Sequence, residues 1–125
     1  MWKKYYDNTT KTLILPSNYI YYEELKIIPK ETEIIVFNED INIFSVSEFN
    51  EPVDDLPENL LEITFGYRFN QSVDNLPNKL IKLTLGTYFD KPINYLPASL
   101  KYLALGRQTP VRLAHPKIFI IFEMT

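Results

Sequence analysis

Residues 69–88 read FNQSVDNLPNKLIKLTLGTY, and the residues on both sides repeat this pattern. The neighbouring copies are FNEPVDDLPENLLEITFGYR at 49–68 and FDKPINYLPASLKYLALGRQ at 89–108, and the three align without gaps. The three glycines of the chain all fall at one position of the repeat: Gly66, Gly86 and Gly106. Tandem repetition with a short period is the sequence signature of a solenoid, in which each repeat forms one coil.

Each copy contains an apolar pattern typical of a strand. In the middle copy, Leu80, Leu83 and Leu85 form L-x-x-L-x-L. The last two are two residues apart, so they point to the same side of a strand, as in the strand segment of a leucine-rich repeat. We interpret Gly86, directly afterwards, as the end of the strand. A glycine there indicates either a left-handed backbone position or a close approach between coils.

The rest of each copy supplies the return path to the next strand. Phe69 provides one large apolar group, Val73 and Leu76 fill the return side, and Pro77 turns the chain back. One coil cannot bury these residues alone, whereas stacked coils can. The sequence therefore predicts a β-rich solenoid. We expect a short, leucine-rich-repeat-like, right-handed stack of coils with one parallel strand per 20-residue repeat and an irregular N-terminal cap.

Each copy begins with a phenylalanine, at Phe49, Phe69 and Phe89. A polar residue follows each of them: Asn50, Asn70 and Asp90. These side chains form either a row of ligands or a row of partners for backbone amides at the turns of successive coils. We favour the second interpretation, because the position belongs to the repeat itself and a coil corner leaves backbone amides that need acceptors.

The pattern F-N-x-P-V-x-x-L-P at 49–57, with its copies at 69–77 and 89–97, closely resembles the FNIP repeat family of amoebal and giant-virus proteins. Ser72 in place of proline and Asp90 in place of asparagine are mild departures. FNIP proteins often join the repeats to an F-box, which recruits a ubiquitin ligase while the repeats hold a substrate. The resemblance therefore implies protein interaction, although the first 48 residues lack the leucine-rich helical pattern of an F-box.

The repeat extends upstream in degenerate form. Residues 28–38 match 56–66, with Asn38 in the glycine position, and asparagine is the next most tolerant residue for a left-handed conformation. Downstream, Pro116, Phe119, Phe122 and Met124 keep the spacing of the repeat and predict a final strand at 118–123. The expected organisation has four parts: an N-terminal cap at 1–27, a degenerate first repeat with an insertion at 28–48, three FNIP-like repeats at 49–108, and a degenerate C-terminal capping repeat at 109–125.

The N-terminal segment is rich in aromatic residues. Residues 12–16 read as a first strand and turn, and residues 17–26 are compatible with a short helix. A solenoid needs an end that hides its last apolar layer, so we expect the aromatic side chains to cap the stack. A binding patch is the alternative role for the same residues: Trp2, Tyr5, Tyr6, Tyr19, Tyr21 and Tyr22.

Composition excludes several functions. The formal net charge of −3 provides no basic field for nucleic acid or an anionic membrane, and the absence of cysteine removes disulfides and thiolate metal sites. No apolar run approaches the length of a membrane helix, and no signal peptide is evident, so we expect a cytoplasmic protein, in the host cytoplasm if it is viral.

No nucleotide-binding, metalloprotease or hydrolase motif occurs, so we expect no enzyme activity, metal site or cofactor. Asp54, Asp55 and Asp74 read as a solvated surface, and His115 is the sole histidine. A hydrolytic enzyme that uses Asp54, Asp55 and His115 remains as a control hypothesis.

The variable positions of the repeats carry the functional candidates. Outward strand positions form two rows across the coils: Ile34, Glu62, Lys82 and Tyr102 in one, and Val36, Thr64, Thr84 and Ala104 in the next. Further candidates follow the glycines. Tyrosine and arginine are enriched in binding hot spots. The candidate protein-binding residues are Glu62, Tyr67, Arg68, Lys82, Tyr88, Tyr102 and Arg107. We expect a protein or peptide partner, which would be a host protein for a viral chain. The alternatives are a structural protein that self-associates through its apolar terminal strand, or a shortened family member without an adaptor role.

Overall fold

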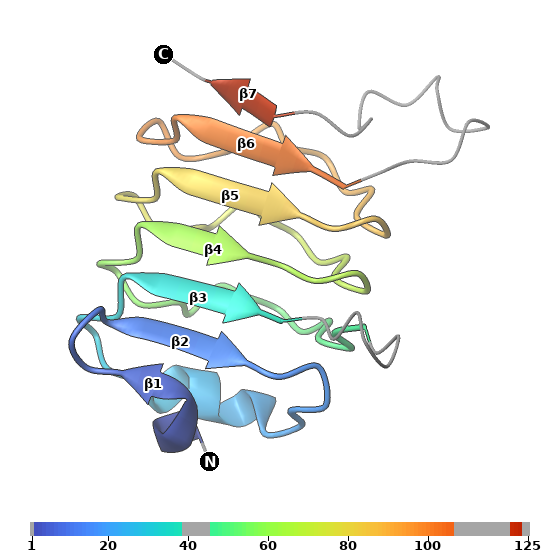
Figure 1. Cartoon of the computed structure of the whole chain (residues 1–125). Helices are drawn as coiled ribbons and strands as arrows, with labels where there is room; N and C mark the ends of the chain where they lie inside the picture. Colours follow the sequence, from blue (N-terminus) through green and yellow to red (C-terminus); the bar gives the residue numbers. More distant parts are fainter. Residues whose placement is uncertain (1, 39–45, 107–120, 124–125) are drawn as a thin grey trace.

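The structure is a computed structural model that describes residues 2–38, 46–106 and 121–123 (Figure 1). The described residues form strands and two short 3-10 helices. In chain order these are η1 (Trp2–Tyr5), β1 (Tyr6–Asp7), β2 (Thr12–Leu15), η2 (Tyr22–Ile27), β3 (Ile34–Phe37), β4 (Glu62–Thr64), β5 (Lys82–Leu85), β6 (Tyr102–Leu105) and β7 (Ile121–Glu123).

The strands form one sheet whose spatial order is the chain order, β1 to β7. Strands β2 to β6 pair in parallel, and each end of the sheet carries one antiparallel strand. Figure 1 shows the parallel strands one above another, joined by segments that run behind the sheet. The predicted parallel-strand solenoid is therefore confirmed. Parallel neighbours need a crossover connection, and the return half of each repeat provides it.

The strand register follows the repeat alignment. Ile63 lies beside Leu83, and Leu83 lies beside Leu103. All three side chains are buried, while the residues on either side of them in each strand are exposed or half-buried. Because side chains alternate along a strand, the L-x-x-L-x-L leucines face the interior and the variable positions face outward. The sequence pattern thus fixes which face of the sheet is free to vary.

The phenylalanines form a continuous stack through the core. The rings of Phe49 and Phe69 are 5.9 Å apart and nearly parallel, and those of Phe69 and Phe89 are 6.2 Å apart. Phe65 of β4's coil stacks on Phe69 with ring centroids 3.8 Å apart. Phe37 extends the stack toward the N-terminus through Phe49, at 4.1 Å. Each regular repeat therefore contributes at least one ring to a column that spans the coils, and the copy at 49–68 contributes two, Phe49 and Phe65.

The glycines are required by a close approach between coils. A Cβ atom on Gly86 would lie 2.2 Å from the carbonyl oxygen of Gly66, and one on Gly106 would lie 2.4 Å from the carbonyl carbon of Gly86. None of the described glycines has a positive φ, so the left-handed alternative is wrong. The left-handed argument for Asn38 is also wrong, because Lys11 is the only described non-glycine residue with positive φ. The alignment of 28–38 itself holds, since Ile35 pairs with Ile63 in register.

The N-terminal segment covers the first coil. Strands β1 and β2 form an antiparallel pair, and η2 overlaps the second half of the segment 17–26 that was expected to be helical. Tyr19 is buried in the core, and four other aromatic side chains pack against the core while remaining partly exposed: Trp2, Tyr5, Tyr6 and Tyr22. Tyr21 is 54% exposed but its ring contacts Tyr19 edge-on. The aromatic residues therefore act mainly as a cap.

The C-terminal strand differs from the expectation in direction. β7 lies within the predicted range, and Phe122 pairs with Leu103 of β6 as the alignment requires. The pairing is antiparallel, however, whereas a further repeat would have made it parallel. The chain before β7 has lost the Phe-Asn and Leu-Pro consensus that builds a parallel crossover, and antiparallel pairing does not require one. Residues 39–45 of the insertion expected at 39–48 lie outside the described residues, as do Pro116, Phe119 and Met124.

Candidate protein-binding surface

Three of the candidate residues form a row across the outer face of the sheet. Glu62 on β4 is in register with Lys82 on β5, and Lys82 is in register with Tyr102 on β6. Lys82 and Tyr102 are exposed, and Glu62 is half-buried. Neighbouring strands lie about 4.8 Å apart, so the row offers an acid, a base and an aromatic ring at that spacing.

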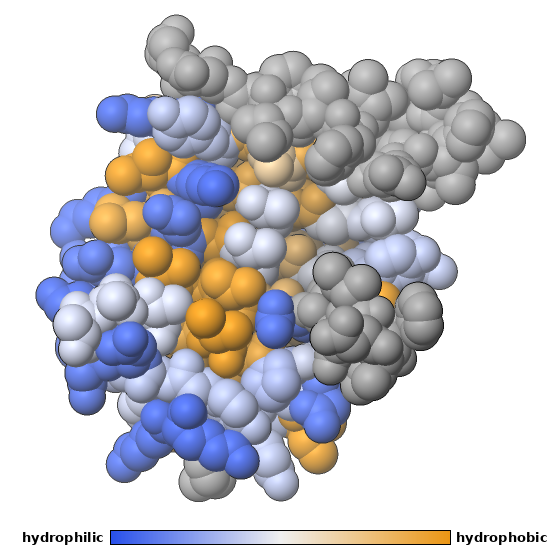
Figure 2. Space-filling model, viewed as in Figure 1, coloured by the Kyte–Doolittle hydropathy of each residue, from blue (hydrophilic) through white to orange (hydrophobic). Residues whose placement is uncertain are grey.

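An apolar patch continues this face toward the N-terminus. Ile14 on β2 pairs with Val36 on β3, and Ile34 lies two residues before Val36 on the same strand. Ile14 is 46% exposed, and Ile34 and Val36 are half-buried. Figure 2 shows hydrophobic surface over this part of the sheet. Ile34 and Val36 belong to the outward rows expected from the sequence, whereas Ile14 was not among them.

A second group of candidates meets at the turns that follow the strands. The rings of Tyr67 and Tyr88 have centroids 5.0 Å apart and are tilted by 40°. The guanidinium carbon of Arg68 lies 5.8 Å from the centroid of the Tyr67 ring and 5.3 Å from that of Tyr88. These distances fall within the range of cation–π attraction, so the three side chains form one cluster, here called the turn cluster.

The turn cluster is held by backbone and charge contacts. The backbone N–H of Tyr88 donates to the carbonyl oxygen of Tyr67 at 3.1 Å, which joins the two turns. Arg68 Nε lies 3.6 Å from Glu48 Oε1, and both side chains are largely exposed. Such an exposed ion pair contributes at most about 1 kcal/mol, so its main effect is to orient the guanidinium. Glu48 was absent from the sequence-based candidates, since it lies in the expected insertion rather than in a repeat.

The structure therefore separates the predicted site into two parts. Tyr67, Arg68 and Tyr88 come together in the turn cluster, whereas Glu62, Lys82 and Tyr102 form the row on the strands. Arg107 lies outside the described residues. Repeat alignment pairs Tyr67 with Thr87, so the contact of Tyr67 with Tyr88 is diagonal between coils and was not evident from the sequence.

The polar row after the phenylalanines has a structural role. Asn50 Oδ1 accepts the backbone N–H of Asn70 at 2.7 Å, and Asn70 Oδ1 accepts the backbone N–H of Asp90 at 3.0 Å. The acceptor of each coil thus satisfies a donor of the next. The ligand interpretation of this row is not needed to explain it.

The acidic residues weighed as a hydrolytic centre lie on the return side of the coils. Asp54 Oδ1 accepts a hydrogen bond from Asn75 Nδ2 at 3.2 Å, and Asp55 is exposed. His115 lies outside the described residues. Among the residues that the structure describes, no group of three or more acidic or histidine side chains is arranged to hold a metal ion. The described part of the chain also contains no helix with the length and apolar character needed to cross a membrane.

Comparison with known proteins bears on the repeats alone. No curated protein matches the chain. The sequence model of the family described as FNIP Repeat matches residues 72–108, which run from the fourth residue of the copy at 69–88 to the end of the copy at 89–108. Residues 72–108 are therefore FNIP repeat sequence, as the tandem copies indicated.

Proposed function

We propose that the chain is a non-enzymatic protein-interaction module whose turn cluster and outer strand row bind a protein or peptide partner. The observation that carries this proposal is the turn cluster, in which Arg68 lies against two tyrosine rings beside a repeat scaffold. Tyrosine and arginine are the residue types most enriched at the energetic centres of interfaces.

Preorganisation supports this role. Arg68 is held by two rings and by Glu48, and the Tyr67 and Tyr88 turns are joined by a backbone hydrogen bond. A partner would therefore immobilise little that is not already ordered, which lowers the entropic cost of binding. Tyr88 remains 48% exposed, so part of its side chain is available for contact.

The finer role that we propose is recognition of a substrate for a ubiquitin ligase in the cytoplasm, with a host protein as the partner if the chain is viral. This step rests on the association of FNIP repeats with F-box adaptors. In such an adaptor the repeats would supply the surface that recognises the substrate.

Affinity purification from lysate, followed by mass spectrometry, tests the binding surface. The wild-type chain is compared with an Arg68→Ala/Tyr88→Ala double variant and with a Lys91→Ala/Tyr95→Ala control, which changes the same residue classes at exposed return-side positions. We expect the first variant to lose proteins that both other baits retain. Equal capture by all three baits would contradict the assignment of the surface. Enrichment of ligase subunits with wild type would support the finer role.

Self-association is the second candidate function, because β7 is the last strand of the described sheet. An end strand presents backbone donors and acceptors along one edge, which another strand can pair with. Light scattering over a hundredfold range of protein concentration tests this proposal. A monomer throughout that range would exclude it.

A further inference from the structure

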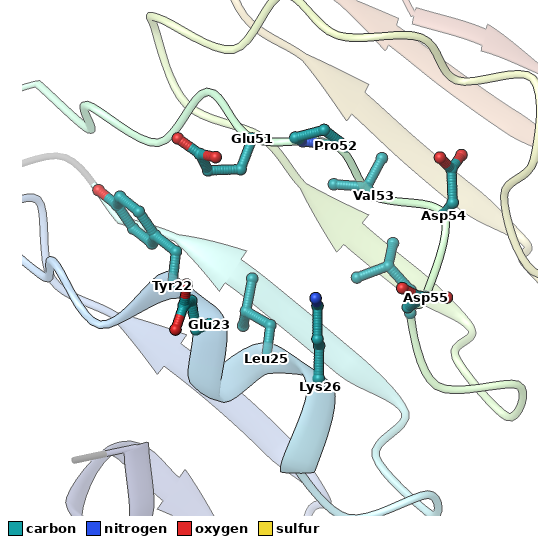
Figure 3. Close-up of a pocket in the computed structure, with 10 residues that line it drawn as sticks. Tyr22, Glu23, Leu25, Lys26, Glu51, Pro52, Val53, Asp54 and Asp55 are labelled. Carbon is teal, nitrogen blue, oxygen red and sulfur yellow. The ribbon is translucent and has the colours of Figure 1, made fainter.

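A pocket lies on the return side of the stack, away from the turn cluster and the outer strand row. It has a volume of about 250 Å³ and opens between η2 and the segment 51–56 of the first regular repeat. In Figure 3, Leu25 and Lys26 rise from η2 toward this segment, and Tyr22 closes one end of the opening. The pocket therefore lies where the N-terminal cap meets the repeats.

The walls of the pocket combine an apolar lining with a negatively charged rim. Val53 is buried, and Leu25 and Leu56 are half-buried, so they provide aliphatic surface. Exposed carboxylates stand around this surface on both sides: Glu23 on η2, and Glu51, Asp54 and Asp55 on the return segment. Lys26 is the one cation among the residues that line the pocket, so four carboxylates face a single ammonium group.

Tyr22, at the end of the pocket, is also affected by nearby negative charge. The pKa of Tyr22 is raised first by burial and then by the negative charges of Glu48 and Glu51. The charges of these carboxylates would also attract a cation, whereas burial opposes any charge. Of these two carboxylates, Glu51 lines the pocket, so the rim contributes to the negative potential at Tyr22.

We propose that this pocket binds the side chain of an arginine or lysine from an extended basic segment of a protein partner. The long aliphatic stem of such a residue would lie along Leu25, Val53 and Leu56, and its charged head would reach the rim. Stems of this kind pack on apolar surface while the head remains hydrated. The rim offers charge-assisted hydrogen bonds, which are the stronger class of hydrogen bond.

The carboxylates of the rim differ in the contacts that they already make. Asp54 already accepts a hydrogen bond from Asn75 of the next coil. Glu51 and Asp55 are exposed, and we assign the main contact with the cationic head to these two residues. Lys26 opposes any cation in the pocket, so it limits the affinity. This arrangement allows both loss and gain of binding to be tested.

The full chain is labelled with ¹⁵N and titrated with small probe peptides. Binding is measured as changes in the backbone amide chemical shifts. The probes are three blocked tripeptides, acetyl-Gly-Xaa-Gly-amide, in which Xaa is arginine, lysine or citrulline. Citrulline has nearly the shape of arginine without its charge. We expect the arginine and lysine probes to give saturable shifts at Leu25, Val53 and Leu56, and the citrulline probe to give none. Arginine binding more tightly than lysine would assign the rim contact to paired hydrogen bonds, and equal binding would assign it to charge alone.

Variants test the assigned residues. Glu51→Gln and Asp55→Asn should each weaken the arginine probe by about two- to fivefold, as expected for exposed charge pairs. Lys26→Ala should strengthen it by a similar factor of about two to five. Glu31→Gln, an exposed carboxylate outside the pocket, is the matched control and should change nothing.

Three results would overturn the proposal: binding of citrulline equal to that of arginine, an equal loss with Glu31→Gln, or shifts that map elsewhere on the chain. Absence of any saturable shift with both cationic probes would overturn it as well. Because these titrations use neither the lysate nor the turn cluster, the result is independent of the proposed function.

Discussion

Asn50 Oδ1 accepts the backbone N–H of Asn70, one coil later, at a distance of 2.7 Å. The same contact recurs between Asn70 and Asp90 at 3.0 Å, so the repeat position after phenylalanine links successive coils. Backbone N–H groups at the turns between coils lie outside the hydrogen-bond ladder of the strands, so they need an acceptor from elsewhere. This short side chain supplies it without a bound ligand.

Removal of one such link should destabilise the stack moderately. We expect Asn70→Ala to lower the free energy of unfolding by about 1 kcal/mol, the usual net contribution of one hydrogen bond. Asn70→Asp should cost less, because a carboxylate oxygen retains the acceptor. Urea melts measure both. Asn78→Ala, at an exposed turn position, is the control and should stay within about 0.5 kcal/mol. Equal losses at Asn70 and Asn78 would show that the link contributes nothing.

The phenylalanine column should dominate stability. Phe69 is fully buried between Phe49 and Phe89, and Phe69→Ala should lower the free energy of unfolding by about 3–5 kcal/mol. Asp74→Ala, an exposed change in the same repeat, should alter it by less than about 0.5 kcal/mol. Denaturant titrations of the two variants make the comparison. Similar losses of unfolding free energy for the two variants would contradict the assignment of Phe69 to the interior and Asp74 to the exterior of the coil.

The glycine position of the repeat should not tolerate a side chain where two regular coils are in contact, as at Gly86. Gly86→Ala places a Cβ atom against the backbone of Gly66, and we expect a loss of about 3 kcal/mol or more because backbone atoms cannot move aside as a side chain can. Asn38 occupies the same repeat position and already carries a side chain. Asn38→Ala should therefore change stability by less than about 0.5 kcal/mol. Thermal melts of the two alanine variants, followed by circular dichroism, test this difference. Tolerance of alanine at residue 86 would contradict it.

The N-terminal cap should make stability depend on pH in the alkaline range. Tyr19 donates its hydroxyl to Glu24 Oε1, and the backbone N–H of Trp2 donates to the same oxygen at 3.1 Å. Burial, then the hydrogen bond to Glu24 and its charge, raise the pKa of Tyr19 above its usual value of 10.0. A raised pKa means that the folded state favours the neutral phenol. The stabilisation from Tyr19 is therefore complete below pH 10 and is lost as the pH rises beyond it.

Tyr19→Phe tests this dependence. At pH 7 the variant should be less stable by about 2 kcal/mol, the range for a hydrogen bond to a charged group. Its stability should then fall less steeply than that of wild type above pH 10. Urea melts between pH 7 and pH 11 measure the difference. Tyr21→Phe removes a hydroxyl from an exposed tyrosine and serves as the control. Parallel pH profiles for wild type and Tyr19→Phe would refute the assignment.

The fold could be predicted from the sequence because the repeat combines two independent signals. Alternating leucines define the inner face of each strand, and tandem copies define the neighbour of each coil, so register follows from alignment alone. The direction of β7 could not be predicted in this way. A strand pattern has the same apolar alternation in both directions, and only pairing with β6 decides between them.

The repeat pattern predicts the solenoid, the inward residues, the return path and the outward row of Glu62, Lys82 and Tyr102. Tertiary structure alone decided which turn residues meet, as the diagonal contact of Tyr67 with Tyr88 shows. It also decided that Gly86 is required by the backbone of Gly66 rather than by its own conformation. The physical reason is the same in both cases. Alignment gives the order of positions along a coil, whereas contacts between coils depend on how closely and at what angle their backbones stack.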